Sequence, residues 1–154
     1  MLIILFQLGD KRYGLDTSRV VEIVPMMPLR EVPGTPPAVA GLMECRGRVV
    51  PVIDLCQLTV GRPAEPVLST RTILVQAGDK PEQLIALMAE QVTDTLSIDE
   101  ADLQDPGLRP PDAPHLGKVI KNESGDLVHC VEVDELLTPE IQALLKRGEE
   151  VSTS

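Results

Sequence analysis

Aromatic residues are almost missing from this 154-residue sequence, which contains one phenylalanine, one tyrosine and no tryptophan. The core is therefore expected to be aliphatic, and Val and Ile favour strands because a branched Cβ fits a pleated surface. The same shortage removes the stacking platforms on which proteins bind single-stranded nucleic acid. A net charge of -10 adds repulsion from phosphates, which disfavours nucleic acids and anionic membrane surfaces as partners.

Long hydrophobic runs are missing as well. The apolar run that opens the chain, Leu2 to Phe6, is far shorter than the roughly 20 residues of a membrane helix. No basic segment precedes it, so we expect neither membrane insertion nor a secretory signal. The cysteines Cys45, Cys56 and Cys130 form an odd set without a disulfide framework, which favours a reducing, cytoplasmic location.

The usual signatures of catalysis and metal binding are also absent. His129 and Cys130 are neighbours on an expected strand, so their side chains point to opposite faces and cannot easily share a metal. The sequence has no C-x-x-C, G-x-S-x-G, P-loop or dinucleotide fingerprint. The acidic residues of 99–105 lack the alternating order of a calcium loop and are expected in an exposed excursion over 97–114. We therefore predict no catalytic residue, no metal and no cofactor.

Short apolar segments separated by turn residues predict a mainly β protein. The expected strands cover 2–8, 13–15, 39–45, 48–53, 71–76, 84–89, 119–121 and 127–133. Asp16, Thr17 and Ser18 are capping residues, so we expect a short helix or turn that carries the apolar residues of 20–24. Asp54 ends a strand and is expected to cap the helical turn after it, which is a structural role.

The clearest helix signal lies near the end of the sequence. Thr138 suits the N-cap, Pro139 the first helical position and Gly148 the position after the last turn. This pattern predicts a C-terminal α-helix over 138–147, followed by a flexible tail over 148–154. Residues 1–147 are expected to form one domain, since a chain of this length can bury a core of its own.

An internal repeat divides that domain. Residues 13–24 can be aligned with 85–96, and each segment follows an apolar strand and a Gly-Asp-Lys turn. Each is followed by a glycine-bearing hairpin and by a strand that runs into a helix, at 49–58 and at 128–137. Any two strand–turn–strand segments share some of these features, but two matched blocks in the same order favour a true repeat. We predict two small antiparallel barrels of about five short strands each, with subdomains of roughly 1–70 and 71–137.

Three segments carry a more specific pattern. They are Phe-Gln-Leu-Gly-Asp to Val-Val-Glu-Ile in 6–23, Val-Pro-Gly-Thr-Pro to Ala-Gly-Leu in 32–42, and Arg-Gly-Arg-Val-Val-Pro-Val-Ile-Asp-Leu in 46–55. Together they resemble the CheW family of chemotaxis coupling proteins, specifically over 6–58 and more weakly to about residue 147. The resemblance implies two interlocked SH3-like five-stranded β-barrels with short helices and a C-terminal α-helix. The stretch 68–75 further resembles paralogues from Wsp-type surface-sensing systems.

The resemblance also implies a function. Members of the family are non-catalytic cytoplasmic adaptors, recruited to receptor arrays at the inner face of the membrane. They hold the cytoplasmic tip of a chemoreceptor, a methyl-accepting chemotaxis protein, in the groove between the barrels. They bind the regulatory domain of a CheA-type histidine kinase at the barrel ends. No cofactor, nucleic acid or direct membrane insertion is implied.

Matched residue by residue, the receptor-facing positions are Val20, Glu22, Arg46 and Gly47. An arginine offers five donors in a rigid fork for the carboxylates and carbonyls of a helix tip. Gly47 lets the chain turn where a side chain would crowd. From the residues alone, Arg46 and Gly47 also fit a plain hairpin turn, Val20 a core position and Glu22 an ordinary surface acid.

Glu44 and Cys45 depart from the family, which usually carries Asn-Leu before its Arg-Gly. We expect them to modify specificity, because a carboxylate beside Arg46 can pair with it. Two other function classes stay open. One is a free-standing regulatory barrel that binds a peptide or small ligand in an apolar pocket, and the other is an enzyme that uses a thiolate at Cys45.

Overall fold

The computed structural model describes the backbone of residues 1–107 and 111–152, with side chains described up to Leu145. Within these residues the chain is mainly β, as the sequence predicts. The strands are β1 (Leu2–Leu8), β2 (Lys11–Asp16), β3 (Val20–Pro25), β4 (Val39–Cys45), β5 (Arg48–Asp54), β6 (Arg71–Gln76), β7 (Leu84–Ser97), β8 (Leu116–Lys121) and β9 (Leu127–Val131). The helices are the 3-10 turns η1 (Thr17–Arg19), η2 (Glu100–Asp102) and η3 (Val133–Leu136) and the α-helices α1 (Leu55–Val60) and α2 (Pro139–Ser152).

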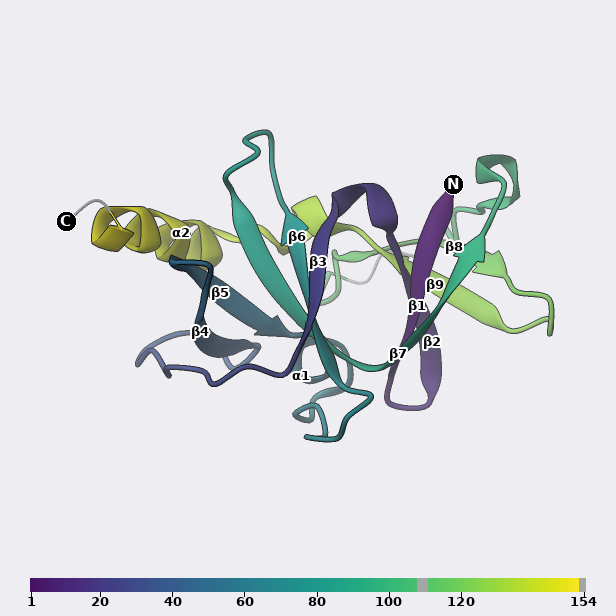
Figure 1. Ribbon diagram of the computed structural model, residues 1–154. Helices are drawn as coiled ribbons and strands as arrows, with labels where there is room; N and C mark the ends of the chain where they lie inside the picture. The colour runs from purple at the N-terminus through teal and green to yellow at the C-terminus, as the bar shows by residue number, and fades with distance from the viewer. Residues whose placement is uncertain (108–110, 153–154) are drawn as a thin grey trace.

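The strands form two five-stranded sheets that share β7 (Figure 1). Sheet A has the order β7-β1-β2-β9-β8, and sheet B has the order β3-β6-β7-β5-β4. Residues 84–89 of β7 pair with β6 in sheet B, and residues 90–97 pair with β1 in sheet A. Gln91, with φ 50°, lies where β7 passes from one sheet to the other. These sheets are the two interlocked SH3-like barrels.

The repeat is visible in the strand order. In the repeat, β1 corresponds to β6, β2 and β3 correspond to the first and second halves of β7, and β4 and β5 correspond to β8 and β9. With this correspondence the two sheets have the same strand order. The expectation of purely antiparallel barrels is wrong, because each sheet contains one parallel pair, β2 with β9 and the first half of β7 with β5. Each barrel therefore takes two strands from one repeat and three from the other.

This exchange corrects the expected subdomains. The boundaries 1–70 and 71–137 delimit the two repeats but not the two barrels, because β2 of sheet A leads through η1 into β3 of sheet B. The second crossover is the bend of β7. Hydrophobic periodicity indicates which face of a strand is buried but not which strand lies beside it. The family resemblance implied interlocked barrels, but the residue pattern did not show which strands are exchanged.

A second correction concerns the residues after Asp16. Its carboxylate accepts a hydrogen bond from the Ser18 amide at 2.9 Å and caps η1 as expected. The helical segment ends at Arg19, however, and 20–25 form β3 with alternating exposure. The β-branched residues of this segment favour a strand, and here that preference outweighs the capping signal.

The C-terminal helix is longer than expected. Ile141 donates its amide hydrogen to Thr138 Oγ1 at 3.4 Å, and α2 continues through Gly148 to Ser152. A glycine inside a helix costs only about 1 kcal/mol relative to alanine, which does not end a helix. Residues 148–152, expected as a flexible tail, are therefore helical, and 153–154 lie outside the described residues. No helix in the described part of the chain is long and apolar enough to cross a membrane.

The core is mainly aliphatic and takes residues from both sheets. Its larger cluster includes Phe6 and Leu8 of β1, Ile73 of β6 and Ile141 of α2. The other face of β1 contributes Ile3 and Leu5 to a smaller cluster in sheet A. The two sheets and the C-terminal helix thus share one main core, which fixes the position of sheet B and of the site described next.

Candidate functional site

Arg46 and Gly47 form the two-residue turn between β4 and β5. Cys45 pairs with Arg48 across the turn, and the central residues have φ values of 53° and 78°. Positive φ at both positions is typical of a type I′ turn, whose twist suits a hairpin. The Arg46 side chain is 77% exposed, so the turn presents it at the tip of the hairpin.

The Arg46 guanidinium reaches across to β3. Its Nη2 lies 3.1 Å from Oε1 of Glu22, whose side chain is 30% exposed. β3 and β4 are the two edges of sheet B, so this ion pair joins the edges. Among the described residues, the buried Oε2 of Glu22 has no hydrogen-bond donor, which leaves Arg46 as the cation that compensates this carboxylate.

Val20 belongs to the same region. It begins β3 and packs, partly buried, against the main core. Val20 and Glu22 share the less exposed side of β3, whereas Val21 and Ile23 are 52% and 38% exposed. The structure therefore brings Glu22 and Arg46 into contact, with Val20 two residues away along β3 and Gly47 in the adjoining turn.

Glu44 does not form the ion pair with Arg46 that the sequence suggests. Glu44 is exposed and pairs in register with Val49, while Arg46 turns toward Glu22. Cys45 is half-buried and packs against the main core rather than on an open surface.

A groove of about 670 Å³ begins beside this turn. It lies between the segment after β3 and the hairpin of β4 and β5. Backbone hydrogen bonds of 2.8 Å in both directions between Arg30 and Leu42 hold that segment against β4. The groove is largely apolar and is lined by Met27, Pro28, Leu29, Arg30, Leu42, Met43, Glu44 and Val49. Sequence reasoning missed it, although the apolar residues between Pro25 and Pro33 were a signal for it.

Two buried carboxylates hold the chain at the opposite end of sheet B. Asp54 Oδ1 accepts hydrogen bonds from the Cys56 and Gln57 amides at 3.0 and 3.2 Å and caps α1, and Oδ2 accepts one from Ala64 at 2.9 Å. Glu90 pairs with Arg62 through both oxygens, at 3.0 and 3.2 Å. Hydrogen bonds from Arg62 are the main cause that lowers the pKa of Glu90 to about 2. Both carboxylates thus bind groups of the chain itself, which is consistent with the structural role expected for Asp54.

The thiols and histidines offer little for catalysis. Burial is the main cause that raises the pKa of Cys56 to about 12, and burial also raises the pKa of Cys130. His115, in the proline-rich segment before β8, is only 1% exposed and lies 3.0 Å from Thr59 Oγ1. Its burial is the main cause that lowers its pKa to about 4, so it is neutral at pH 7. Within the described residues, no group of three His, Cys or acidic side chains could hold a metal.

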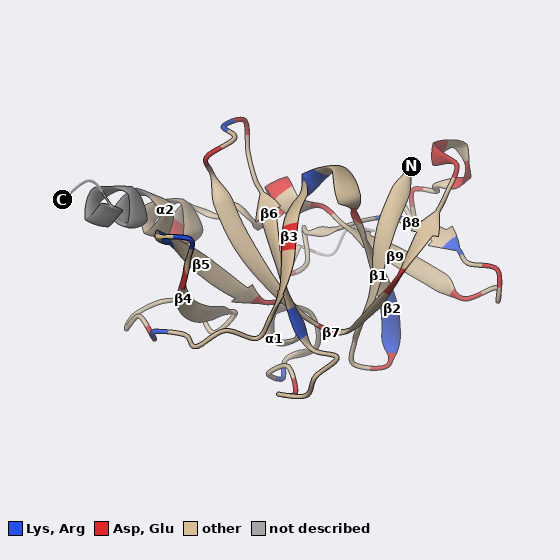
Figure 2. Ribbon diagram, viewed as in Figure 1, with Lys and Arg blue, Asp and Glu red and all other residues tan. Residues whose placement is uncertain are grey.

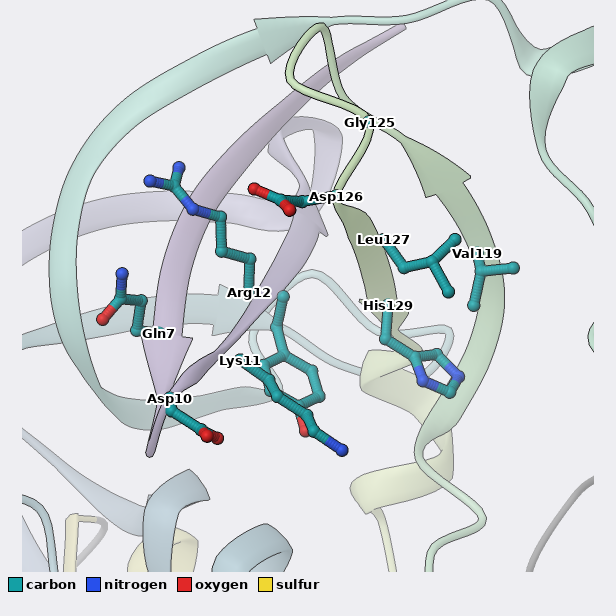
Figure 3. Close-up of a pocket in the computed structure, with 10 residues that line it drawn as sticks. Gln7, Asp10, Lys11, Arg12, Val119, Gly125, Asp126, Leu127 and His129 are labelled. Atoms are coloured by element: carbon teal, nitrogen blue, oxygen red, sulfur yellow. The ribbon is translucent and has the colours of Figure 1, made fainter.

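A second cleft, of about 540 Å³, lies on sheet A beside β2 and β9. Figure 3 shows Arg12 and His129 pointing in opposite directions, so the charged and polar groups do not converge on one point. The Tyr13 ring stacks at 6.3 Å on His129, whose Nε2 lies 2.9 Å from the Gly117 carbonyl oxygen. Figure 2 shows the basic residues in small, separate places among more numerous acidic ones. The cleft therefore has the features of a surface depression rather than a ligand site.

Comparison with known proteins agrees with this architecture. The sequence profile described as the CheW-like domain matches residues 2–140. The chain belongs to the CheW-like domain family. It is 29% identical over 133 residues to the chemotaxis protein CheW of Helicobacter pylori, covering 86% of this chain and 78% of that protein. It is 28% identical over 102 residues to the chemotaxis protein CheW of Rhizobium meliloti, covering 66% of this chain and 64% of that protein.

The same relationship is seen in a solved structure. The crystal structure of the scaffolding protein TtCheW from Thermoanaerobacter tengcongensis superposes with a TM-score of 0.78 at 25% sequence identity. The superposition covers 91% of this chain and 89% of that protein. The match to the rhizobial protein spans slightly less than two thirds of its length, so activity and partners are inferred from the site of this chain.

Proposed function

We propose that this protein is a non-catalytic cytoplasmic adaptor that couples a chemoreceptor to a CheA-type histidine kinase. The observation that carries the proposal is the Glu22–Arg46 ion pair at an exposed turn beside an apolar groove. The relatives named chemotaxis protein CheW and the scaffolding protein TtCheW support the same class of function. In this role the protein controls kinase output by holding two partners in a fixed geometry.

The receptor-facing site is proposed to consist of Val20, Glu22, Arg46 and Gly47 together with the apolar groove. The tip of a receptor is a helical hairpin, and its apolar side chains can enter a groove lined by Met and Leu. Arg46 is 77% exposed and still has donors free for carboxylates or carbonyls of the partner. Glu44 lines the groove and would bias it against partners that are acidic at this point.

The kinase contact is proposed at the barrel ends, away from this groove. The loop after α1 exposes Val67 and Leu68, whose exposed fractions are 48% and 97%. Arg62, bound to Glu90, and the Ala64 amide, bound to Asp54, hold the loop firmly on sheet B. A rigid loop that presents apolar side chains is suited to a protein–protein contact.

The test is binding to two probes from the same genome, a soluble fragment of the receptor signalling tip and the kinase regulatory domain. We expect the wild-type protein to bind both and Arg46→Glu to lose the receptor fragment selectively, because the reversal repels Glu22 and removes the donors. Arg48→Glu is the matched control. Arg48 lies on the same hairpin as Arg46, but it donates a hydrogen bond to the Glu82 carbonyl in the hairpin between β6 and β7. Failure of the wild-type protein to bind either probe would contradict the proposal.

A peptide-binding regulatory barrel is the second candidate, and the apolar groove is the observation that favours it. The two functions predict different results for binding to the kinase regulatory domain. A peptide-binding barrel would bind the receptor fragment or an unrelated apolar peptide equally well and would not bind the kinase domain.

A further inference from the structure

Arg19 ends η1, at the crossover from sheet A to sheet B. Its Nη1 donates to Gln76 Oε1 at 3.0 Å, to the Gln76 carbonyl at 3.4 Å and to the Gly78 carbonyl at 3.3 Å. Its Nη2 forms an ion pair with Asp134 Oδ2 at 2.6 Å. Asp134 Oδ1 also accepts a hydrogen bond from the Gly78 amide at 3.0 Å. We call Arg19, Gln76, Gly78 and Asp134 the Arg19 cluster.

The Arg19 cluster joins three segments that are far apart in the sequence. Gln76 and Gly78 lie at the hairpin between β6 and β7 of sheet B, and Asp134 lies in η3, which follows β9 of sheet A. Further hydrogen bonds hold this hairpin together, because Gln76 Nε2 donates to the Gly78 and Lys80 carbonyls at 2.7 and 3.0 Å. The cluster therefore fixes the crossover relative to both barrels.

A β-bulge follows directly after Arg19. Val20 pairs with Val75 and Glu22 pairs with Leu74, so Val21 is an extra residue in β3. A bulge changes the direction of the side chains beside it. Gln76, which binds Arg19, is the residue after Val75, so the cluster holds the strand on one side of the bulge.

We propose that Arg19 is a positioning residue for the receptor-facing site. By tying the crossover to Gln76, Gly78 and Asp134, it fixes the bulged start of β3 and thereby places Val20 and Glu22 for receptor binding and for contact with Arg46. This inference rests on the proposed adaptor function and extends its site to residues that do not touch the partner.

The exposure of the cluster separates this role from a purely structural one. The side chains of Arg19 and Asp134 are 32% and 53% exposed, and exposed ion pairs contribute little to stability. The other crossover has a comparable ion pair. In the alignment of the two repeats Arg19 corresponds to Gln91, and the residue before it, Glu90, binds Arg62. That pair lies far from Val20 in the sequence and holds the loop after α1 instead.

The first test compares Arg19→Gln with Arg62→Gln in binding to the receptor fragment and the kinase domain. We expect Arg19→Gln to weaken receptor binding about tenfold and leave kinase binding within about twofold. Arg62→Gln should leave receptor binding within about twofold even though it lowers the melting temperature more. Wild-type receptor affinity in Arg19→Gln, or an equal loss in Arg62→Gln, would overturn the inference.

The second test does not depend on the receptor. Hydrogen exchange of the full chain should show faster amide exchange over β3 in Arg19→Gln and faster exchange over 61–70 in Arg62→Gln. Arg19→Lys keeps the charge but lacks the planar fork, so it should restore β3 protection only in part. Unchanged exchange over β3 in Arg19→Gln overturns the inference whether or not the wild-type protein binds a receptor. If the wild-type protein binds neither the receptor fragment nor the kinase domain, but amide exchange over β3 becomes faster in Arg19→Gln, only the adaptor function is overturned.

Discussion

The two barrels have the same strand order, but they differ in what surrounds the strands. In sheet B, β5 leads into α1 and also contacts α2, and this sheet contributes much of the main core. Sheet A contributes strands to that core and keeps a smaller cluster of its own on its other face. The duplicated topology therefore supports two different tasks. Sheet B presents the exposed turn and the apolar groove, and sheet A provides the crossover strands that hold sheet B in place.

The two crossovers show the same contrast. At one, Arg19 pairs with Asp134 near the surface, and at the other, Glu90 pairs with Arg62 and is only 7% exposed. The charges are reversed, and each partner follows the last strand of the other repeat, β9 for Asp134 and β5 for Arg62. The buried pair is suited to hold the fold, and the exposed pair, next to Val20, is suited to place the site.

The largest effects are expected in the core. Ile73 in the main cluster and Ile3 in the smaller cluster are both 0% exposed, so truncation to alanine removes the same atoms from each. We expect Ile73→Ala to lower the free energy of unfolding by about 4 kcal/mol and Ile3→Ala by about 2.5 kcal/mol, because the smaller cluster can relax around the cavity. Urea denaturation of both variants measures this difference, and equal losses would show that the two clusters form one core.

A smaller and pH-dependent effect is expected at the buried crossover. The pKa of Glu90 falls from an ordinary 4.5 to about 2, chiefly through hydrogen bonds from Arg62. Since the folded state favours the charged form, this stabilisation is complete above about pH 5 and is lost as the pH falls toward 2. The difference in unfolding free energy between the wild-type protein and Glu90→Gln should therefore be constant from pH 5 to 8 and shrink below pH 4.5. A difference that does not change with pH would show that Glu90 is not stabilised as a charged group.

The smallest effects on stability are expected at two hairpin glycines in equivalent places. Gly47 of sheet B has φ 78° and Gly125 of sheet A has φ 82°, and no atom lies within 4 Å of an added Cβ at either position. Alanine at either site should cost about 1 kcal/mol, the penalty of a left-handed backbone. Only Gly47→Ala should also weaken receptor binding, because it adjoins Arg46. Titrating both variants with the receptor fragment checks this, and equal affinities would remove Gly47 from the site.

Much of the fold could be predicted because its signals are local. The hairpins at Gly9, at 46–47 and at 122–125 follow from turn chemistry, and the cap at Asp54 follows from its place between a strand and a helix. The repeat was also detectable. The family resemblance implied interlocked barrels, but the residues did not show which strands are exchanged. The segment through η1 has the same local pattern whether the next strand joins the same sheet or the other one.

The sequence predicted which positions belong to the candidate site, but it did not predict which of these residues contact each other. The Arg46–Gly47 turn could be placed from the sequence, whereas the partner of Arg46 could not, because Glu44 is near in sequence and Glu22 is near only after sheet B closes. The apolar groove depends on the same closure, through the pairing of Arg30 with Leu42. The burial of His115 likewise depends on α1 packing against it.

The central claim, which is a proposal, is that this protein holds a receptor tip and a kinase regulatory domain together in one complex. The most direct measurement immobilises the kinase regulatory domain and records how much receptor fragment it retains with and without the protein. Our account predicts retention only when the protein is present, in proportion to its amount, with a large loss for Arg46→Glu. Retention that does not depend on the protein, or no retention although each partner binds separately, would contradict it.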